Sequence, residues 1–256
     1  MGIFFVSLLH QLLLIMKQAL GSIFIAASVV IAAALFSYTY ANRHKAEDVI
    51  FVTGLGSKDF ISDLIVWEGS FSRTSFNLAE ASEALNKDRE IIKEFLSSKG
   101  VPAESIIFSA VNIEKQFDSR YEGERYISIF AGYGLTQRVT IESNEVDKIE
   151  SVSREVTELI NSGIEFYSSE PQYYFTKLAE LKIEMIAAAT QDAKVRAEQI
   201  ALNAGANLGN LRNANMGIFQ ITAQNSSEDY SWGGTFNTSS KRKTASITMR
   251  LEYQVD

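Results

Sequence analysis

Histidine and cysteine are nearly absent from this chain. Its 256 residues include only His10 and His44 as histidines, and no cysteine. The part after Lys45 therefore lacks the usual general base near neutral pH, the thiolate nucleophile and the best ligands for soft metal ions. It cannot form disulfides either. These absences exclude most familiar catalytic mechanisms, and we predict no catalytic, cofactor-binding or metal-binding residues and no cofactor.

Basic residues are also scarce outside the N-terminal region. All 31 Asp and Glu residues follow residue 45, but only 21 of the 24 Lys and Arg residues do, because Lys17, Arg43 and Lys45 come first. The net charge of this part is therefore about −10. Its one basic cluster, Lys241-Arg242-Lys243, is interpreted as a solvated turn. Since a phosphate-binding surface needs a basic patch, we expect no nucleic acid partner.

One long stretch carries no charge at all. Residues 18–42 are uncharged and largely apolar, whereas a membrane-spanning helix needs about 20 such residues. Lys17 precedes the stretch and Arg43 follows it, as interface anchors would. We predict that residues 1–45 hold a membrane anchor. The alternatives are a signal peptide cleaved near Ala32-x-Ala34 and a buried helix of a soluble protein, and the flanking charges do not decide the orientation.

Hydrophobic periodicity predicts an α+β fold for residues 46–256. Only two prolines occur in the chain, which argues against long linkers. The patterns predict strands over 49–53, 64–72, 105–113, 126–141, 164–167, 209–221 and 244–253, and helices over 78–96, 144–160 and 174–203. We therefore expect two ferredoxin-like βαβ-type halves, about 46–125 and 126–256, with helices packed on antiparallel or mixed sheets.

Two short motifs resemble catalytic or nucleotide-binding patterns. Gly54-x-Gly56 has Asp59 where a dinucleotide-binding loop has its third glycine, so we interpret it as a turn that ends the first strand. Ser240-x-x-Lys243 has the spacing of a Ser-Lys dyad. It lies in residues 224–243, which are rich in Ser, Asn, Gly and Thr and are predicted to form a mobile loop. Such a loop would not hold a nucleophile in place, so we predict no catalytic role.

Acidic clusters leave a second functional class open. Glu122 with Glu124, and Glu145 with Asp147, could pair for acid–base chemistry or bind a hard cation. We interpret them as solvated faces and as charges at helix N-termini. The alternative is a carboxylate-based hydrolase or a metal-dependent enzyme of unknown substrate.

Three aromatic residues in the last loop are the candidate interaction residues. Tyr230, Trp232 and Phe236 stand in a polar segment, where aromatic side chains often serve as contact anchors. The alternative is a loop that folds back on its own domain. We predict a homo-oligomer that uses this loop, an exposed strand edge or both. The alternative to that prediction is a monomer.

Several segments together resemble a known family. They are Val52-Thr53-Gly54-Leu55-Gly56, Ile65-Val66-Trp67, Asp192-Ala193-Lys194-x-Arg196-Ala197-Glu198, Leu208-Gly209 and Ala245-Ser246-Ile247-Thr248. Through these segments the chain resembles the SIMPL-domain family, which includes YggE-like bacterial envelope proteins. The resemblance covers about residues 48 to 255.

The resemblance implies a place in the cell and a type of role. Such proteins look like periplasmic or cell-envelope proteins linked to oxidative-stress defence, with no established catalytic mechanism. It therefore favours a single-pass protein of the bacterial inner membrane whose soluble domain faces the periplasm. The implied role is non-catalytic binding or assembly with an unknown envelope protein partner. No catalytic residues carry over, and the alanines and paired charges of residues 192–198 suit helix packing.

Overall fold

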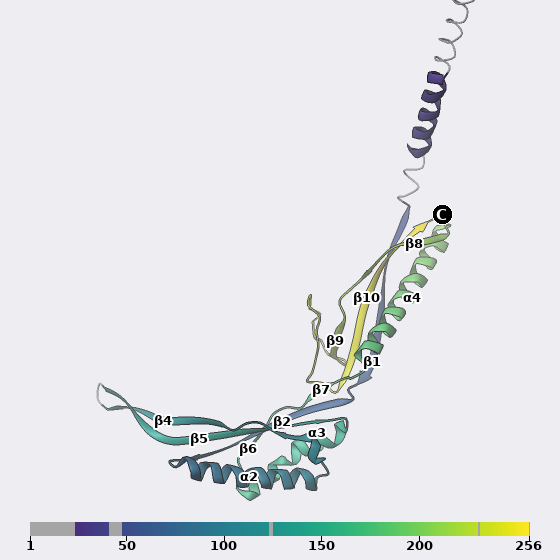
Figure 1. Ribbon diagram of the computed structural model, residues 1–256. Coiled ribbons are helices and arrows are strands. Elements are labelled where there is room, and N and C mark those ends of the chain that lie inside the picture. The colour runs from purple at the N-terminus through teal and green to yellow at the C-terminus, as the bar shows by residue number, and fades with distance from the viewer. Residues whose placement is uncertain (1–23, 41–47, 123–124, 230, 256) are drawn as a thin grey trace, which may run out of the picture. The chain divides into compact units, whose positions relative to one another are not determined.

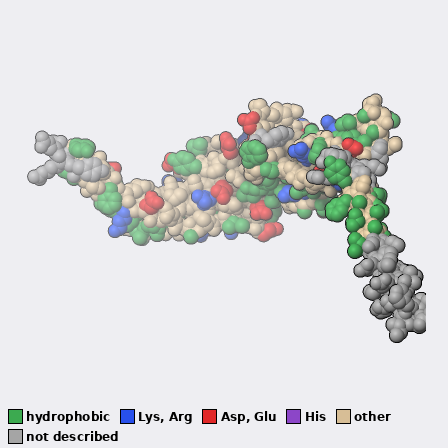
Figure 2. Space-filling view, turned by 90° about the horizontal axis from the view of Figure 1, so that it is seen from above, with side chains coloured by type: hydrophobic (Ala, Val, Ile, Leu, Met, Phe, Trp, Pro, Cys, Tyr) green, Lys and Arg blue, Asp and Glu red, His purple; other side chains and the backbone are tan. Residues whose placement is uncertain are grey.

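The N-terminal region is described only in part. The computed structural model describes residues 24–40, 48–122, 125–229 and 231–255. Residues 24–40 form a helix with exposed apolar side chains, and Figure 2 shows hydrophobic side chains covering this segment beside the grey atoms. No helix of the described residues is both long enough and apolar enough to cross a membrane. Residues 18–23 and 41–42 of the predicted span lie outside the described residues.

The remaining elements confirm an α+β fold with antiparallel strand pairs (Figure 1). The strands are β1 (Val49–Ile61), β2 (Leu64–Ser75), β3 (Ile106–Phe108), β4 (Asn112–Glu122), β5 (Arg125–Ser143), β6 (Phe166–Ser168), β7 (Gln172–Tyr174), β8 (Leu208–Met216), β9 (Gln220–Ala223) and β10 (Arg242–Val255). The helices are α2 (Leu78–Ser98), α3 (Val146–Glu155) and α4 (Leu178–Ala204), with 3-10 turns η2 (Ala103–Ser105) and η3 (Val156–Ser162).

The chain forms two compact units. One holds the described residues up to Thr53 together with Ala193–Asn215 and the described residues from Arg250 onward. The other holds Gly54–Asp192 and Met216–Met249. The second unit contains all the candidate site residues that the structure describes.

A six-stranded sheet organises the second unit. Its strand order is β3-β5-β2-β6, with β4 on β5 and β7 on β2. Along β2, buried and less buried residues alternate, so Ile65, Trp67 and Phe71 point to one face. These three side chains are fully buried in the main hydrophobic core with residues of α2 and α3. Both helices therefore cover the same face of this sheet.

Helix α2 agrees closely with its predicted range. Asn77 caps its N-terminus by accepting a hydrogen bond from the backbone N–H of Ala79. Leu85 and Ile92 lie on its buried face. After the helix, Gly100 adopts a positive φ of 80°, which suits a glycine stop. The apolar spacing and the glycine stop are both local signals, which is why the sequence predicts this helix.

A partly buried ion pair joins α2 to β2. The guanidinium of Arg73 contacts the Asp88 carboxylate through Nε at 2.5 Å and Nη2 at 2.9 Å. The Asp88 side chain is only 6% exposed, whereas that of Arg73 is 35% exposed. Because little water reaches the Asp88 carboxylate, its negative charge is stabilised mainly by this bidentate contact.

The other sheet has the strand order β1-β10-β8, with β9 on β10, and α4 lies along it (Figure 1). Here the predicted turn at Gly54-x-Gly56 is wrong, because both glycines lie within β1. A Cβ atom on Gly56 would lie 2.3 Å from the carbonyl oxygen of Met185 and 3.1 Å from the amide nitrogen of Ala189. The glycine is therefore needed for the close approach of β1 to α4 rather than for a turn.

The long predicted helix is confirmed as α4, with its narrow stripe of small residues. In the second unit, Leu181, Met185 and Ala189 are buried. In the first unit, Ala193 and Ala197 are fully buried. Small side chains on this face let the helix approach the sheet closely.

The region between α2 and α3 differs from the prediction. The single strand expected over 105–113 is broken into β3 and the start of β4. Strand β4 then continues to Glu122 and pairs with β5 as an antiparallel hairpin. The pairing shifts register between Gln116 and Phe117, where Gly132 has a φ of 133°. From Ile113 onward only every fourth residue of β4 is apolar, so this strand shows neither an apolar run nor strict alternation in the sequence.

Candidate functional site

The structure describes two of the three candidate interaction residues. Tyr230 lies outside the described residues. Trp232 is 96% exposed, which is unusual for the largest apolar side chain. Phe236 is 48% exposed, and its backbone forms a bridge with Ile221 of β9. The two described aromatics therefore differ, because Trp232 projects into solvent whereas Phe236 lies against the domain.

The loop that was predicted to be mobile is held to β9 by hydrogen bonds. The side chain of Gln220 donates to the Ser231 carbonyl oxygen at 2.9 Å and accepts from the Thr235 backbone N–H at 2.6 Å. The backbone N–H of Ile221 donates to the Thr235 carbonyl oxygen, and that of Asn237 donates to the Ile221 carbonyl oxygen. A buried amide on β9 thus fixes both sides of the segment that carries the exposed indole.

A mainly apolar pocket of about 490 Å³ lies beside Trp232. It is lined by residues of β1, the β8–β9 connection, β9, the last loop and β10: Leu55, Gly217, Ile218, Gln220, Ser231, Trp232, Ser246, Ile247 and Thr248. Ser246 and Thr248 are the polar residues that β10 contributes to this lining. A volume of this size, with few polar groups, is typical of a site for a small molecule or an inserted side chain.

A glycine shapes one wall of this pocket. The backbone N–H of Gly217 donates to the carbonyl oxygen of Thr248 at 2.8 Å. A Cβ atom at position 217 would lie 2.3 Å from the Thr248 hydroxyl oxygen. Any larger residue at position 217 would displace the Thr248 side chain, so glycine suits the close approach of the β8–β9 connection to β10.

Lys243 contradicts the predicted solvated turn. Its side chain is 1% exposed at the start of β10. The ammonium group donates to the carbonyl oxygens of Tyr173 at 2.5 Å and Asn237 at 2.6 Å. It also lies 5.8 Å from the centre of the Phe236 ring, within the range of a cation–π contact. This lysine is a packed structural group that joins β7 to the last loop.

Burial has an electrostatic consequence for Lys243. Loss of hydration disfavours the charged form and lowers its pKa from 10.5 to about 8, against a smaller opposing effect of Glu228. The ammonium contacts carbonyl dipoles rather than a carboxylate. Because one nitrogen donates to both carbonyl oxygens, the side chain links the backbone of β7 to that of the last loop.

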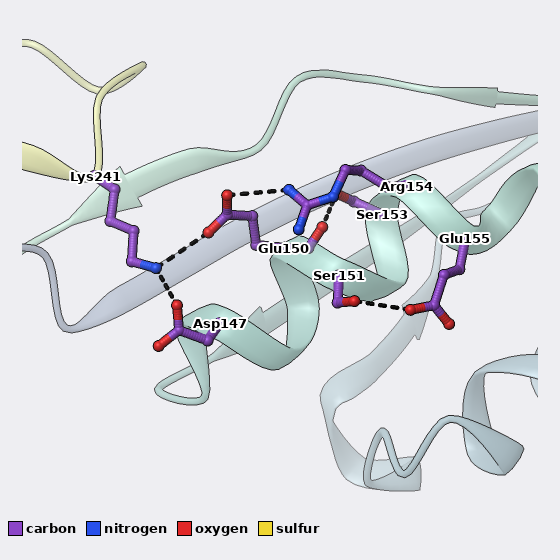
Figure 3. A network of polar contacts seen from close by, with 7 residues as sticks. All are labelled: Asp147, Glu150, Ser151, Ser153, Arg154, Glu155 and Lys241. Carbon is purple, nitrogen blue, oxygen red and sulfur yellow. Dashed lines mark hydrogen bonds and ion pairs between the residues drawn. The ribbon is translucent and has the colours of Figure 1, made fainter.

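Lys241 instead belongs to a partly exposed ion-pair network, shown in Figure 3. Its ammonium group contacts Asp147 and lies 3.1 Å from the Glu150 carboxylate. Glu150 also accepts from Arg154 at 3.1 Å. Burial acts to raise the pKa of Glu150, but the hydrogen bonds from Lys241 and Arg154 outweigh it and lower that pKa. The network ties the segment before β10 to α3.

The acidic clusters are arranged as surface ion pairs where the structure describes them. Glu145 pairs with Lys148 at 2.7 Å, and Asp147 pairs with Lys241. The side chain of Glu122 and the whole of Glu124 lie outside the described residues. Within the described ranges, no group of three or more His, Cys, Asp or Glu residues could hold a metal ion.

Most residues of the pocket are not marked by any pattern in the sequence. Gly217, Gln220 and Thr248 carry no chemical signature in the sequence, and they come together only through strand pairing. The one available signal was Trp232 itself, an aromatic residue within a polar segment.

Comparison with known proteins identifies the family but no specific relative. No curated protein matches the chain. The family model SIMPL, described as a protein of unknown function (DUF541), matches residues 50–254. This match covers both sheets and the candidate site, and it agrees with the resemblance seen in the strand and helix segments. The chain therefore belongs to the SIMPL family.

Proposed function

We propose that this protein is a non-catalytic binding and assembly protein of the bacterial cell envelope. It is anchored in the inner membrane by its N-terminal segment, with the SIMPL domain facing the periplasm. The uncharged residues 18–42 and the exposed apolar side chains of the helix over residues 24–40 support the anchor. The family resemblance supports the orientation.

The exposed indole of Trp232 beside the apolar pocket carries this proposal. The side chain is 96% exposed, yet its backbone neighbours are fixed by Gln220. Tryptophan is enriched among the residues that dominate binding energy at protein interfaces. Burying such a side chain contributes roughly 2–3 kcal/mol from apolar area alone. A bound partner would therefore cover Trp232 and fill the pocket with an apolar group.

We propose two kinds of partner for the domain. One is an envelope protein of unknown identity that binds at Trp232, and the other is a second copy of this chain. Anchoring in a membrane raises the local concentration of the domain, so that weak contacts become populated. The protein therefore acts as a homo-oligomer in this proposal.

Site-directed photocrosslinking in cells tests the binding site. The full chain is produced in bacteria with p-benzoylphenylalanine in place of Trp232 and irradiated. The matched control places the same group at Ile183, which is 71% exposed on α4. We expect a discrete adduct from position 232 and much less from position 183. Absence of any adduct from position 232, or equal adducts from both, would contradict the proposed site.

The proposed location and physiological role have separate tests. The anchored protein should stay in the membrane fraction after alkaline carbonate extraction, and its mass should include residues 18–42. Release of a protein that lacks them would contradict the anchor. The resemblance also links the role to oxidative-stress defence. Loss of the gene should then lower survival in hydrogen peroxide, and unchanged survival would remove this link.

A further inference from the structure

The hairpin of β4 and β5 exposes a strand edge. Strand β5 pairs with β2 only from Tyr133 onward and with β3 only over Val139–Ile141. Residues 125–130 of β5 therefore pair with β4 alone among the described strands. Within the described part of the chain, strand β4 pairs only with β5, and Figure 1 shows no strand on its other side. Its outer edge thus presents backbone groups that a further strand could pair with.

The same strand carries three exposed apolar side chains at regular spacing. Ile113 is 54% exposed, Phe117 is 54% exposed and Tyr121 is 75% exposed. They are four residues apart, so they lie on one face of the strand. Within the chain, the Phe117 ring contacts Phe130 with 5.9 Å between ring centroids. Isolated exposed apolar residues are common on protein surfaces, but a row along a strand edge suits an interface.

We propose that β4 pairs antiparallel with β4 of a second copy of this chain, about a two-fold axis at Phe117. The proposal rests on the homo-oligomer of the proposed function and names its contact. Strand β4 has 11 residues, and Phe117 is the middle one. Full overlap of the two strands therefore places Phe117 opposite Phe117 of the partner subunit. It also places Ile113 opposite Tyr121 of the partner subunit, twice by symmetry, so that each apolar side chain of the row has an apolar cross-strand neighbour.

The charges of β4 favour this register. Full overlap places Glu114 opposite Arg120 of the partner subunit, again twice by symmetry. Opposite charges on paired strands attract each other, whereas like charges in that position destabilise the pairing. A centre at Gln116 would place Glu114 opposite Asp118 of the partner subunit. A centre at Asp118 would oppose the two Asp118 carboxylates. The charge pattern thus disfavours the two adjacent symmetric registers.

The absence of native cysteine makes this register directly testable by disulfide formation. The full chain is oxidised in membranes with copper–phenanthroline as Phe117→Cys or, as the matched control, Ser119→Cys. Directly opposite Cα atoms lie about 4.5–5.5 Å apart, within the limit of roughly 7 Å for a disulfide. The two copies of position 119 would be offset by four residues, or about 13 Å. We expect at least tenfold more disulfide-linked dimer from Phe117→Cys than from Ser119→Cys.

Mixing two variants gives a second measure of the same register. Lys115→Cys and Ser119→Cys, produced together with different tags, should form a mixed disulfide, since full overlap places these positions opposite each other. In the Phe117→Cys background, Glu114→Arg should lower the dimer yield several-fold, and adding Arg120→Glu should restore it. Equal disulfide yields at positions 117 and 119, or no mixed disulfide, would overturn the register.

The oligomeric state separates this proposal from the one on which it rests. It is measured by light scattering on the unmodified full chain in detergent. An oligomer whose Phe117→Cys variant forms no disulfide would overturn the β4 contact and leave the homo-oligomer standing. A monomer would overturn both. An oligomer with the expected disulfide pattern supports both.

Discussion

The buried ammonium group of Lys243 makes the stability of this domain depend on pH in an unusual direction. Lys243 has a pKa of about 8 in the folded protein, against 10.5 as its ordinary value. Between these values the unfolded chain binds more protons than the folded one. The free energy of unfolding therefore rises as pH rises from about 8 to 10.5. Most lysines in ion pairs have the opposite effect, because their pKa is raised by folding.

The size of the effect follows from the difference in pKa. One pKa unit corresponds to about 1.4 kcal/mol, so keeping Lys243 charged in the fold at neutral pH costs roughly 3 kcal/mol. The unfolded chain binds more protons than the folded one, and integrating this difference from pH 7 to 9.5 gives a gain of about 2 kcal/mol in unfolding free energy. The remaining gain comes above pH 9.5.

Replacing Lys243 with Met should remove this dependence. The assay is urea unfolding of the full chain at pH 7 and at pH 9.5, followed by the fluorescence of the buried Trp67. Between the two pH values, the free energy of unfolding of wild type should rise by about 2 kcal/mol more than that of the Met variant. Lys241→Met is the matched control. The hydrogen bond from Lys241 to Asp147 raises the pKa of Lys241 above 10.5, so its contribution should not change in this window.

Other shifted groups titrate outside the chosen window. Folding lowers the pKa of three carboxyl groups, whose effects fall in the acid range: Asp59, Glu150 and Glu155. It raises the pKa of three tyrosines and one further lysine, whose effects fall above pH 10: Tyr167, Tyr173, Tyr253 and Lys99. The difference in unfolding free energy between wild type and Lys243→Met should rise with pH. A difference that stays constant or falls with pH would refute the assignment of a buried charge to this lysine.

Three further predictions concern the stability of the fold, and all are tested by urea unfolding. Gly56→Ala should destabilise the domain by about 1–3 kcal/mol, because its Cβ would lie 2.3 Å from a helix carbonyl oxygen, and an unchanged midpoint would contradict this. Ala193→Leu should lower the free energy of unfolding by roughly 1–3 kcal/mol, because it overpacks a fully buried site. Its control, Lys194→Ala at an exposed site, should lower it by less than about 0.5 kcal/mol. A larger loss from Lys194→Ala than from Ala193→Leu would show that the lysine has a polar role in the helix. Arg73→Met should cost about 3–5 kcal/mol by leaving the Asp88 carboxylate buried and unpaired, and Arg73→Met with Asp88→Leu should recover most of that loss if the argument holds.

Local signals explain what the sequence predicted correctly. Helix α2 has apolar residues at a spacing of three or four and a Gly100 stop, both within one short segment. Helix α4 shows the same kind of periodicity, with Ala193 and Ala197 on its buried stripe. Such features depend on neighbours along the chain, so the sequence alone is sufficient to place them.

Other features depend on contacts that the sequence does not display. Gly56 is a packing glycine because α4 lies against it, and nothing near it in the sequence distinguishes this role from a turn. Lys243 is buried because carbonyl groups of Tyr173 and Asn237 surround its ammonium group. Backbone acceptors are present at every residue, so no motif marks them. The pocket beside Trp232 is built by strand pairing, which also leaves no local pattern.

The loop around Trp232 shows how an exposed aromatic side chain can be held ready for binding. A single buried amide, that of Gln220, bonds the backbone at Ser231 and at Thr235. These two residues flank the segment that contains Trp232, so the backbone on both sides of the indole is already ordered. Binding by a flexible loop would lose more conformational entropy, and preorganisation reduces that loss. Hydrogen bonds to β9 therefore fix the backbone that presents the exposed Trp232, which suits the proposed binding role.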